Sequence, residues 1–451
     1  MDARQLAERI CGVLRDAGYQ AYLVGGCVRD IVLGRPAQDF DVATDATPDC
    51  VQAMFPGSVG VGAAFGVILV LDPDSDAKVE VATFRTDLAY ADGRRPVAVI
   101  FGKSAEEDVR RRDFTINGLL LDPRDNRILD FVGGQDDLRA GIVRAIGDPV
   151  ERFREDKLRL LRAVRFAARF GYTIEPATFA AVCEHAADID AVSAERIREE
   201  LTRILTEGGA RRGFTLLEET RLLEHVLPEV ARMRGVAQPP EYHPEGDVWT
   251  HTLLVLEQLP AGISPTLAWG ALLHDVGKPP TFAAPRGPGD RIHFDGHAEV
   301  GTRMAEEIAR RLRFSGEETG RVAALVAQHM RFKDVLDMRP ATLKRFVRQP
   351  HFDEHLALHR IDCLASHGKL DSFDFVRQFL EATPAEAVRP ARLVNGDDLK
   401  QLGLPPGPGY RRILDAVEEA QLEGRLATRE QALQFVRQYS SEQQGLAMPK
   451  R

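Results

Sequence analysis

The stretch LVGGCVRDIVLGRPAQDFDVAT (23–44) decides the fold class of the N-terminal part of the chain. A short apolar run at 22–24 predicts a strand, and Gly25 and Gly26 after it predict a turn into a short helix. A second strand is expected to carry Asp39 and Asp41. Glycines after a strand let a phosphate approach the backbone, and the N-terminus of the following helix offers free N–H groups. The alternative is an ordinary Gly-Gly turn.

Asp39 and Asp41 are the first candidate catalytic residues. Residues two apart on a strand point to the same face, so the two carboxylates are expected to converge. Two unpaired like charges are costly unless a cation lies between them, and Mg²⁺ is typically held by one or two carboxylates together with substrate phosphates. Glu80, in KVEVATF, is a possible third ligand from a neighbouring strand. The alternatives are a solvated Asp-rich turn and an exposed glutamate.

The pattern around this stretch changes along the chain. Short apolar or alternating runs from Tyr22 to about Val132 predict a mixed sheet with few helices. From about Asp136 onward the spacing is mostly helical, so the fold class is α+β, an N-terminal head followed by a long α-helical body. The helices are expected at 4–18, 155–170, 177–188, 194–206, 211–224, 251–259, 266–276, 297–312, 319–330, 341–348, 354–367, 371–381, 410–421 and 428–438.

A basic stripe marks the helix expected at 155–170. Residues 152–170 contain seven Arg or Lys and two Asp or Glu. Positions three apart lie on neighbouring turns, so one side of the helix can present four charged residues while Leu and Ala pack on the other. These four are Asp156, Arg159, Arg162 and Arg165. The alternative is a solvated basic face.

A second constellation lies in the later helices. His and Asp side chains drawn from several helices of a bundle suit one or two divalent ions, often transition metals. The candidate ligands are His251, His274, Asp275, His297, His329 and Asp362. With 12 histidines in the chain, the alternative for each one alone is a structural role.

Length and composition set the outer limits. A chain of 451 residues with 28% charged residues suggests about three globular domains. The N-terminus has no signal-peptide pattern, no run of 18 apolar residues is present, and five scattered cysteines contain no CxxC pair. We therefore expect a cytoplasmic protein without a membrane partner. The net charge of −9 argues mildly against a nucleic-acid partner.

Five motifs in order resemble one family. They are LVGGCVRDIVLG…QDFDVATDATP, EVATFR (80–85), DGRRP (92–96), RRDFTING (111–118) and EDKLRLLRAVRFAARF (155–170). Together they are similar to the class II CCA-adding tRNA nucleotidyltransferases, a family shared with bacterial poly(A) polymerases. The resemblance covers about residues 20–230. It implies a polymerase β-like nucleotidyltransferase head, a mixed sheet plus helices, followed by an elongated all-α neck, body and tail.

The resemblance also implies roles for single residues. Gly26 and Arg29 would contact the triphosphate, Asp39 and Asp41 would bind catalytic Mg²⁺, and Arg112 would contact the nucleotide with Asn117 supporting the site. Residues 85–96 match the flexible loop that helps the family switch from CTP to ATP. Asp156 and Arg159 match the EDxxR motif that reads the base of the incoming nucleotide, with Arg162 and Arg165 also expected at the nucleotide. ERIREEL (195–201) matches the next motif, with an expected helix-capping and scaffolding role.

The physics of base reading fits this assignment. An aspartate accepts a hydrogen bond from an exocyclic amine, and an arginine donates to ring nitrogen or carbonyl acceptors. Cytosine and adenine both carry an exocyclic amine, whereas uracil and guanine do not present that pattern in the same place. One Asp–Arg pair could therefore accept CTP and ATP and reject UTP and GTP.

The order H…HD…H…H…D resembles the HD phosphohydrolase superfamily. The resemblance implies an HD-type helical domain that binds an additional transition metal, Ni²⁺ or Mn²⁺, and raises the hypothesis of a second, metal-dependent phosphohydrolase activity. Some family members with an intact HD domain hydrolyse 2′,3′-cyclic phosphates or 2′-phosphates at tRNA ends.

The sequence thus predicts four parts: a head (1–140), a helical neck and body that reads the nucleotide and binds RNA (141–235), an HD-type domain (236–385), and a tail that contacts the tRNA elbow (386–451). The predicted function is template-independent addition of CCA to the 3′ end of tRNA from CTP and ATP, with release of pyrophosphate. The alternatives are a poly(A) polymerase, a CC-only or A-only enzyme, and an HD phosphohydrolase whose head positions RNA.

Overall fold

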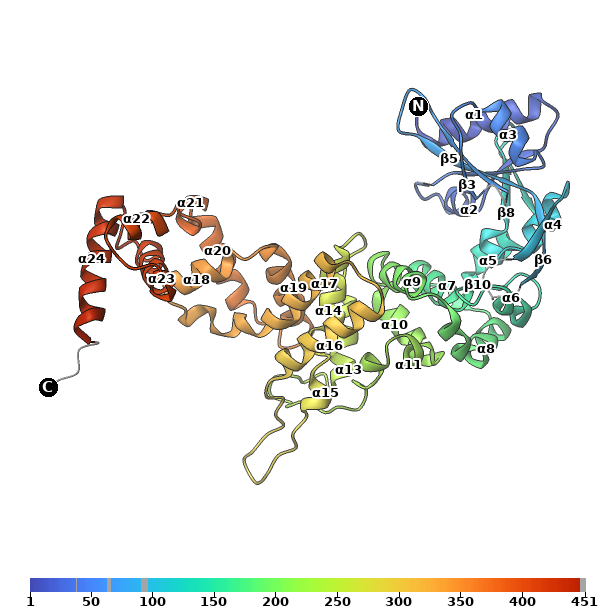
Figure 1. The fold of residues 1–451 in the computed structure, drawn as a ribbon. Coiled ribbons are helices and arrows are strands. Elements are labelled where there is room, and N and C mark those ends of the chain that lie inside the picture. Colours follow the sequence, from blue (N-terminus) through green and yellow to red (C-terminus); the bar gives the residue numbers. More distant parts are fainter. Residues whose placement is uncertain (38, 63–65, 91–95, 447–451) are drawn as a thin grey trace.

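A computed structural model gives the structure of the chain and describes residues 1–37, 39–62, 66–90 and 96–446. The molecule is elongated, with the head at one end and the C-terminal helices at the other (Figure 1). The parts follow one another in space in the order in which they occur in the sequence (Figure 1). The predicted α+β head followed by a long helical body is confirmed.

The head is built on a seven-stranded mixed sheet of order β3-β4-β5-β2-β1-β8-β9. In this sheet β2 and β5 are parallel neighbours and the other pairs are antiparallel. A separate antiparallel pair is formed by β6 and β7. The strands are β1 (Ala21–Val24), β2 (Asp41–Thr44), β3 (Val59–Gly62), β4 (Val67–Leu71), β5 (Lys78–Thr83), β6 (Arg85–Tyr90), β7 (Pro96–Phe101), β8 (Leu119–Asp122) and β9 (Arg127–Asp130).

Both faces of the central strands are covered. Side chains alternate across the sheet, so Leu23 and Val42 join the main core together with the first helix, while Val24 and Ala43 join a small core on the opposite face. The helical segments of the head are α1 (Ala3–Asp16), α2 (Gly26–Val32), α3 (Pro48–Met54), α4 (Ala105–Arg110), the 3₁₀ turn η2 (Thr115–Asn117) and α5 (Gly134–Ala140).

The middle of the chain is helical apart from one short parallel strand pair, β10 (Ile142–Val143) with β11 (Thr173–Ile174). Its apolar residues continue the main core of the head without a break. Its helical segments are α6 (Pro149–Glu155), α7 (Arg159–Phe170), α8 (Pro176–Glu184), η3 (Ala186–Ala191), α9 (Ala194–Thr206), α10 (Ala210–Glu219), α11 (Leu222–Val226) and α12 (Pro228–Ala231).

The C-terminal half is a second helical block and a tail. The helices α14 and α16 pack on α17, and the long loop between α15 and α16 projects from the body (Figure 1). The elements are α13 (Val248–Glu257), α14 (Pro265–Leu273), α15 (Lys278–Thr281), α16 (His297–Arg311), α17 (Gly316–Gln328), η4 (His329–Asp337), α18 (Pro340–Val347), α19 (Phe352–Ala365), α20 (Asp371–Ala382), α21 (Ala385–Val388), α22 (Gly396–Gln401), α23 (Pro408–Leu422) and α24 (Arg429–Leu446).

The helix predicted over 155–170 is wrong at its start. The chain forms α6 up to Glu155, adopts an extended conformation at Asp156 (φ −142°, ψ 104°), and begins α7 only at Arg159. The cause is local: the Asp156 carboxylate accepts a hydrogen bond from the backbone N–H of Leu158 at 3.1 Å, which competes with the helical pattern. The charged stripe is therefore divided by a turn.

All five cysteines are free thiols. None of the helices in the described ranges is long and apolar enough to cross a membrane. Of the loop expected to help the CTP-to-ATP switch, residues 85–90 and 96 lie in β6 and β7, while 91–95, which hold most of DGRRP, fall outside the described residues.

Candidate active site and histidine centre

Three carboxylates gather where β2 begins. Asp41 is the first residue of β2, and its register partner on the parallel strand β5 is Glu80, so the prediction that a neighbouring strand brings Glu80 beside Asp41 is confirmed. Asp39 precedes β2, so the expectation that it lies within the strand is wrong. Burial, Glu80 and Asp39 together raise the pKa of Asp41 to about 6 against the opposing effect of Arg112.

This electrostatic setting fits a cation. A raised pKa means that the ionised form of Asp41 is disfavoured by its surroundings, and a divalent ion would remove that penalty. Oxygen ligands of this kind suit Mg²⁺. The residues present therefore fit the divalent metal that the resemblance of the head implies.

A glycine turn lies against Arg112. Gly25 has φ +79°, a region that glycine adopts without strain, and it directs the chain into α2. A Cβ atom at Gly25 would stand 3.7 Å from Nη1 of Arg112. The guanidinium of Arg112 donates to Asp108 through Nη2 at 3.0 Å, and its buried Nε has no hydrogen-bond partner in the described part of the chain. Arg112 thus faces both the glycine turn and the carboxylates.

Arg29 is placed differently from Arg112. Its side chain is only 5% exposed, and it donates from Nη1 to Oδ1 of Asn117 at 2.7 Å and from Nε to Asp30 at 2.9 Å. Its guanidinium lies over the ring of Phe170 on α7, 4.6 Å from the centroid. The structure therefore turns Arg29 toward the neck, and its predicted contact with a triphosphate stays a prediction.

Asp113 is a functional residue that the sequence reasoning missed, although it lies in the quoted motif RRDFTING. It is buried, accepts from Asn117 Nδ2 at 3.2 Å, and accepts from Arg162 Nη2 at 2.6 Å. Burial alone would raise its pKa, but Arg162 and Arg159 outweigh burial and lower the pKa to about 2. Asp113 therefore links the head to α7 through a buried ion pair.

The predicted base-reading residues lie on either side of the break before α7. Asp156 is held by Arg196 of α9, whose Nη2 stands 2.8 Å from Oδ2, so a residue of ERIREEL does support this turn. Arg159 donates to Glu155 at 2.7 Å and to the backbone oxygen of Arg111 at 2.9 Å. Both side chains are thus fixed by partners from the head and the neck.

The rest of the predicted stripe does not stay on one surface. Arg162 binds Asp113 in the head, as described above, whereas Arg165 is 3% exposed and donates to Glu200 of α9 at 2.6 Å. A second acceptor for Arg165 is Glu207 at 3.2 Å. Arg165 is therefore enclosed within the neck, and a direct contact with a nucleotide stays a prediction.

All six predicted ligands of the second constellation come together. His251 lies on α13, His274 and Asp275 follow α14, His297 opens α16, His329 follows α17, and Asp362 lies on α19. The Nε2 atoms of His251 and His274 are 3.3 Å apart, as are those of His297 and His329. In the described residues these side chains form two groups that could each hold an ion: His251, His274 and Asp362, and Asp275, His297 and His329.

Asp275 stands between the two groups. Its Oδ2 is 3.2 Å from Nε2 of His274, and its Oδ1 is 3.7 Å from Nε2 of both His297 and His329. One carboxylate thus offers one oxygen to each group. The two groups would hold divalent ions, with Asp275 beside both groups, and imidazole donors of this number suit transition metals.

The histidine rings are already oriented for metal binding. The Nδ1 atoms of His274, His297 and His329 lie 2.8, 2.8 and 2.7 Å from the carbonyl oxygens of Ala271, Phe294 and Val326. A carbonyl can only accept, so each Nδ1 carries a proton, and Nε2 is the ring nitrogen that each histidine directs at the ligand groups. Such outer hydrogen bonds are what fixes the tautomer of metal-bound histidines.

His251 is oriented by a carboxylate that the sequence analysis missed. Its Nδ1 lies 2.8 Å from Oε1 of Glu245, and the same oxygen lies 2.8 Å from Nδ1 of His243. Burial opposes protonation of His251, but Asp362 and Glu245 outweigh burial and raise its pKa to about 9. Only proximity in three dimensions reveals Glu245, because it precedes α13 in a Pro-rich loop without a helical pattern.

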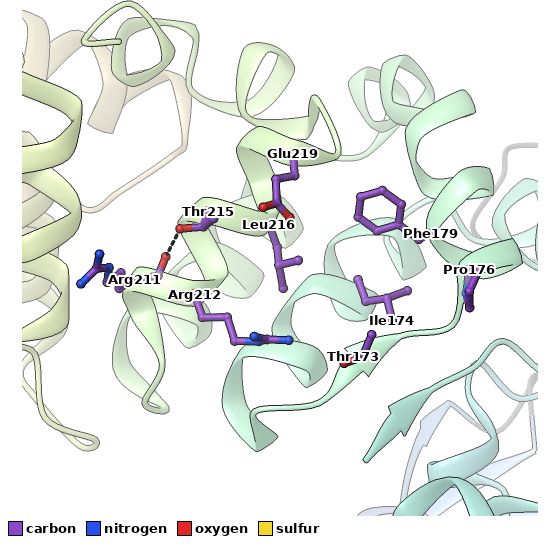
Figure 2. Close-up of a pocket in the computed structure, with 9 residues that line it drawn as sticks. All are labelled: Thr173, Ile174, Pro176, Phe179, Arg211, Arg212, Thr215, Leu216 and Glu219. Carbon is purple, nitrogen blue, oxygen red and sulfur yellow. Dashed lines mark hydrogen bonds between the residues drawn. The ribbon is translucent and has the colours of Figure 1, made fainter. Parts of the chain in front are cut away.

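A cavity in the neck is separate from both sites. Its volume is about 730 Å³, and it lies between β11, α8 and α10. Figure 2 shows Arg212 of α10 extending toward Ile174, while the Arg211 side chain points away from Ile174 and Phe179. None of the residues that line it belongs to the carboxylate cluster or to the histidine centre.

Comparison with known proteins assigns the family. Residues 21–144 match the family described as "Poly A polymerase head domain", 171–233 match "Probable RNA and SrmB- binding site of polymerase A", and 248–354 match "HD domain". A protein of Streptococcus mutans named "CCA-adding enzyme" is 31% identical over 427 residues, which covers 94% of each chain. The chain belongs to the CCA-adding enzyme family.

Further relatives of the same name agree. The CCA-adding enzyme of Limosilactobacillus fermentum is 41% identical over 219 residues, 49% of this chain and 54% of that protein. Alignments with the first such relatives thus span little more than half of their length. The crystal structure of the Bacillus stearothermophilus CCA-adding enzyme in complex with CTP has a TM-score of 0.74 and 26% identity, and covers 99% of this chain and 100% of that one.

Proposed function

We propose that the protein adds CCA to the 3′ end of tRNA without a template, using CTP and then ATP and releasing pyrophosphate. The observation that carries this proposal is the register of Asp41 with Glu80, which places three carboxylates beside the Gly25 turn and Arg112. Membership of the CCA-adding family supports the same reaction. The tRNA substrate implies a cytoplasmic location.

In the head, Asp39 and Asp41, with Glu80 beside them, would hold Mg²⁺. When bound, Mg²⁺ lowers the pKa of the attacking 3′-hydroxyl and neutralises charge on the departing pyrophosphate. Gly26 and Arg29 would contact the triphosphate, and Arg112 would contact the nucleotide. A Cβ at Gly26 would stand 3.5 Å from Nη2 of Arg29, and a Cβ at Gly25 would stand 3.7 Å from Nη1 of Arg112, so both guanidinium groups lie beside the turn. Positioning and charge stabilisation are the main protein contributions to nucleotidyl transfer of this kind.

In the neck, Asp156 and Arg159 would read the base. Asp156 would accept from the exocyclic amine of cytosine or adenine, while Arg159 would donate to a ring acceptor. Arg162 donates to Asp113, and Arg165 donates to Glu200. These two arginines would therefore affect nucleotide binding indirectly, by holding α7 in place. The proposal divides the chain into four parts: head (1–140), neck and body (141–235), HD-type domain (236–385) and tail (386–451). The tail would contact the tRNA elbow.

One experiment tests the proposal and its nearest rivals. The protein is incubated with labelled CTP or ATP and one of three RNAs: a tRNA lacking its last three nucleotides, a tRNA lacking only the final adenosine, and an unstructured RNA. We expect completion to CCA on both tRNAs and none on the unstructured RNA. Long A-tracts on any RNA would indicate a poly(A) polymerase, and addition to one tRNA alone would indicate a CC-only or A-only enzyme.

A second candidate function is metal-dependent phosphohydrolysis at the histidine centre. Three histidines with Nδ1 fixed by carbonyls and the position of Asp275 between two ligand groups favour it. Bound Ni²⁺ or Mn²⁺ would activate a water molecule for attack on a phosphoester. We expect the purified protein to contain such a metal, to open a 2′,3′-cyclic phosphate at an RNA end to a phosphomonoester, and to release inorganic phosphate from an RNA end carrying a 2′-phosphate. Retained metal or hydrolysis in the double variant His274→Ala, Asp275→Ala would reject this assignment.

A further inference from the structure

Two loops meet beside the histidine centre. The first precedes α13 (residues 234–247), and the second joins α15 to α16 (residues 282–296) and projects from the body (Figure 1). Arg291 of the second loop donates from Nη1 to the hydroxyl of Tyr242 in the first at 2.8 Å. The same guanidinium lies over the Tyr242 ring, 5.1 Å from its centroid. The two loops therefore form one surface.

The second loop is an organised hairpin. Ala283 and His293 exchange two backbone hydrogen bonds, of 2.9 and 3.0 Å. At the tip, the Asp290 carboxylate accepts from the backbone N–H groups of Arg286 at 2.7 Å and Arg291 at 2.9 Å. The N–H of Arg286, the ring of His293 and the N–H of Arg291 lower the pKa of Asp290 to about 2. The charge of Asp290 is thus used within the tip, whereas the exposed guanidinium of Arg286 has no partner among the described residues.

Each loop carries an exposed aromatic ring. Tyr242 is 51% exposed and Phe282 is 43% exposed. Phe282 touches only the edge of the surface, against Phe294, with ring centroids 6.0 Å apart and an interplanar angle of 59°. Apolar groups stabilise a fold by leaving water, so rings that remain this exposed add little to the core. Exposed rings beside arginines are what proteins use to stack the bases of single-stranded nucleic acid.

Phe294 connects this surface to the histidine centre. Its carbonyl oxygen accepts from Nδ1 of His297 at 2.8 Å, and its ring centroid is 5.5 Å from Nζ of Lys278. The same Nζ stands 2.7 Å from Oδ2 of Asp275, which lies beside both ligand groups. A single lysine side chain therefore separates the aromatic surface from the ligands. A phosphate bound at the centre would have its attached nucleoside within reach of the rings.

The surface offers two separate places for a base. One is the pair of rings formed by Phe282 and Phe294, and the other is Tyr242 with Arg291. A mononucleotide has one base and can occupy only one of them, whereas an unpaired RNA end can occupy both. Stacking on a ring tolerates every base, because each base has a π face. The surface thus suits an RNA end of any sequence.

We propose that Phe282 and Tyr242 stack the last unpaired bases of an RNA 3′ end and thereby make the histidine centre selective for RNA ends over mononucleotides. The inference rests on the proposed phosphohydrolysis and deepens it by naming the substrate class. It is independent of nucleotide addition in the head.

Three variants and one matched control test the inference in the full-length protein with its bound metal. Phe282→Leu and Tyr242→Leu keep an apolar side chain but remove the ring, and Phe282→Tyr keeps the ring. The control is Phe131→Leu, the same change at a phenylalanine of the head that is 36% exposed. The substrates are a short single-stranded RNA with a 2′-phosphate at its 3′ end, uridine 2′-phosphate, and 4-nitrophenyl phosphate. The readout is kcat and KM for release of phosphate.

We expect the wild type to prefer the RNA over uridine 2′-phosphate in kcat/KM. Phe282→Leu and Tyr242→Leu should each raise KM for the RNA about tenfold, the loss expected from one base–aromatic stack. Their kcat, and their hydrolysis of 4-nitrophenyl phosphate, should stay at the wild-type level because the metal ligands are unchanged. Phe282→Tyr and Phe131→Leu should keep the wild-type KM.

A second readout requires no metal and no hydrolysis. The same RNA, with 4-thiouridine as its last residue, is crosslinked by ultraviolet light to protein treated with a chelator, and the crosslinked peptides are mapped by mass spectrometry. We expect crosslinks within residues 282–294 and at Tyr242, and their loss from 282–294 in Phe282→Leu. Crosslinks confined to the head and neck would reject the inference.

Three further results separate the explanations. If Phe282→Leu slows hydrolysis of all three substrates equally, the ring supports the centre and does not bind a base. If the wild type hydrolyses uridine 2′-phosphate as efficiently as the RNA, the proposed selectivity is wrong. A protein that crosslinks at 282–294 but hydrolyses none of the substrates would reject the phosphohydrolase function and leave the stacking contact standing, so the two failures are distinguishable.

Discussion

At the scale of single residues, Asp113 shows how a buried charge is kept ionised. It carries a full negative charge inside the protein because Arg162 and Asn117 satisfy both of its oxygens. Removing one partner of such a pair leaves the other uncompensated and is strongly destabilising. The stability of the contact between head and neck should therefore depend on the ionisation of this one carboxyl.

The first prediction concerns acid stability. Because the folded pKa of Asp113, about 2, lies below its unfolded value of 3.8, its stabilising effect is complete above the unfolded value and is lost as the pH falls through the folded one. The shift corresponds to about 2 kcal/mol at neutral pH. We expect Asp113→Asn to lower the free energy of unfolding at pH 7 and to converge with the wild type near pH 2, measured by urea denaturation across that range.

The control for this prediction is Asp136→Asn. Asp136 also pairs with an arginine, Arg139, but its side chain is 81% exposed, so the pair should contribute little. Equal losses in the two variants at pH 7 would contradict the role of burial.

The second prediction concerns base choice. Asp156→Ala should raise acceptance of UTP and GTP relative to CTP and ATP by about 10- to 100-fold, the range set by one good base-edge contact. Addition itself should continue, because the carboxylates of the head are untouched. Asp39→Asn provides the contrast, since it should abolish addition of every nucleotide. Steady-state incorporation on the shortened tRNAs is the measurement, and unchanged base preference in Asp156→Ala would reject this reading of the neck.

At the scale of helices and strands, the structure shows which features a linear pattern can predict. The pairing of Asp41 with Glu80 followed from the alternating pattern of the strand that carries Glu80. The choice of the six ligands of the histidine centre followed from the order of His and Asp residues that resembles the HD superfamily. The break at Asp156 did not follow, because it depends on one side-chain hydrogen bond and on Arg196 from a distant helix. The same holds for Glu245, whose role exists only through its contact with His251.

A close approach of two segments positions the histidine centre. A Cβ at Gly277, directly after Asp275 and Val276, would stand 2.1 Å from the carbonyl oxygen of His297 and 2.6 Å from the nitrogen of Gly301. Only glycine fits there, since those are backbone atoms of α16 that cannot move alone. The glycine therefore allows Asp275 to reach the histidines at the start of α16.

The third prediction uses this contact. Gly277→Ala should lower stability by about 1–3 kcal/mol through overpacking and should reduce bound transition metal, because α16 must move away from Asp275. The matched control is Gly320→Ala on α17, where an added Cβ has nothing within 4 Å. That change should be neutral or stabilise by up to about 1 kcal/mol, through helix propensity. Urea denaturation and metal analysis of the purified proteins are the measurements; wild-type metal content in Gly277→Ala would contradict the prediction.

At the scale of the whole molecule, three apolar cores follow one another along the chain, in addition to the small core on one face of the head sheet. The main core runs from the head through the neck into the second helical block, a second core surrounds Phe332, and a third fills the tail between Val394 and Val436. The junction between the last two is polar: Arg348 pairs with Glu418 at 2.8 Å, and Lys344 donates to the carbonyl of Leu422. Polar junctions of this kind couple domains weakly.

The fourth prediction follows from these separate cores. Differential scanning calorimetry should show at least two transitions, with the small tail core unfolding first. Val417→Ala, in the tail core, should lower only the early transition, and Leu161→Ala, in the main core, only the late one. Loss of these buried side chains should lower the affected transition by several degrees. A single transition that moves in both variants would show instead that the molecule unfolds as one unit.

The net charge misleads when it is taken alone, although the motifs of the same sequence predict a tRNA partner. A net charge of −9 argued mildly against nucleic acid, yet the chain belongs to a family named for adding nucleotides. Total charge sums over the whole chain and does not report where basic and acidic side chains lie. Local potential, which the total does not report, is what phosphate contacts depend on.

The linear layout of the molecule bears on how it is made. The head, neck, second helical block and tail lie in space in the order of the sequence (Figure 1), and the sheet of the head is complete once β9 has been synthesised. A chain leaves the ribosome from its N-terminus at about 5–20 residues per second, and domains generally fold as units during that time. Each part of this protein can therefore bury its apolar residues against parts that have already emerged, without waiting for the C-terminus.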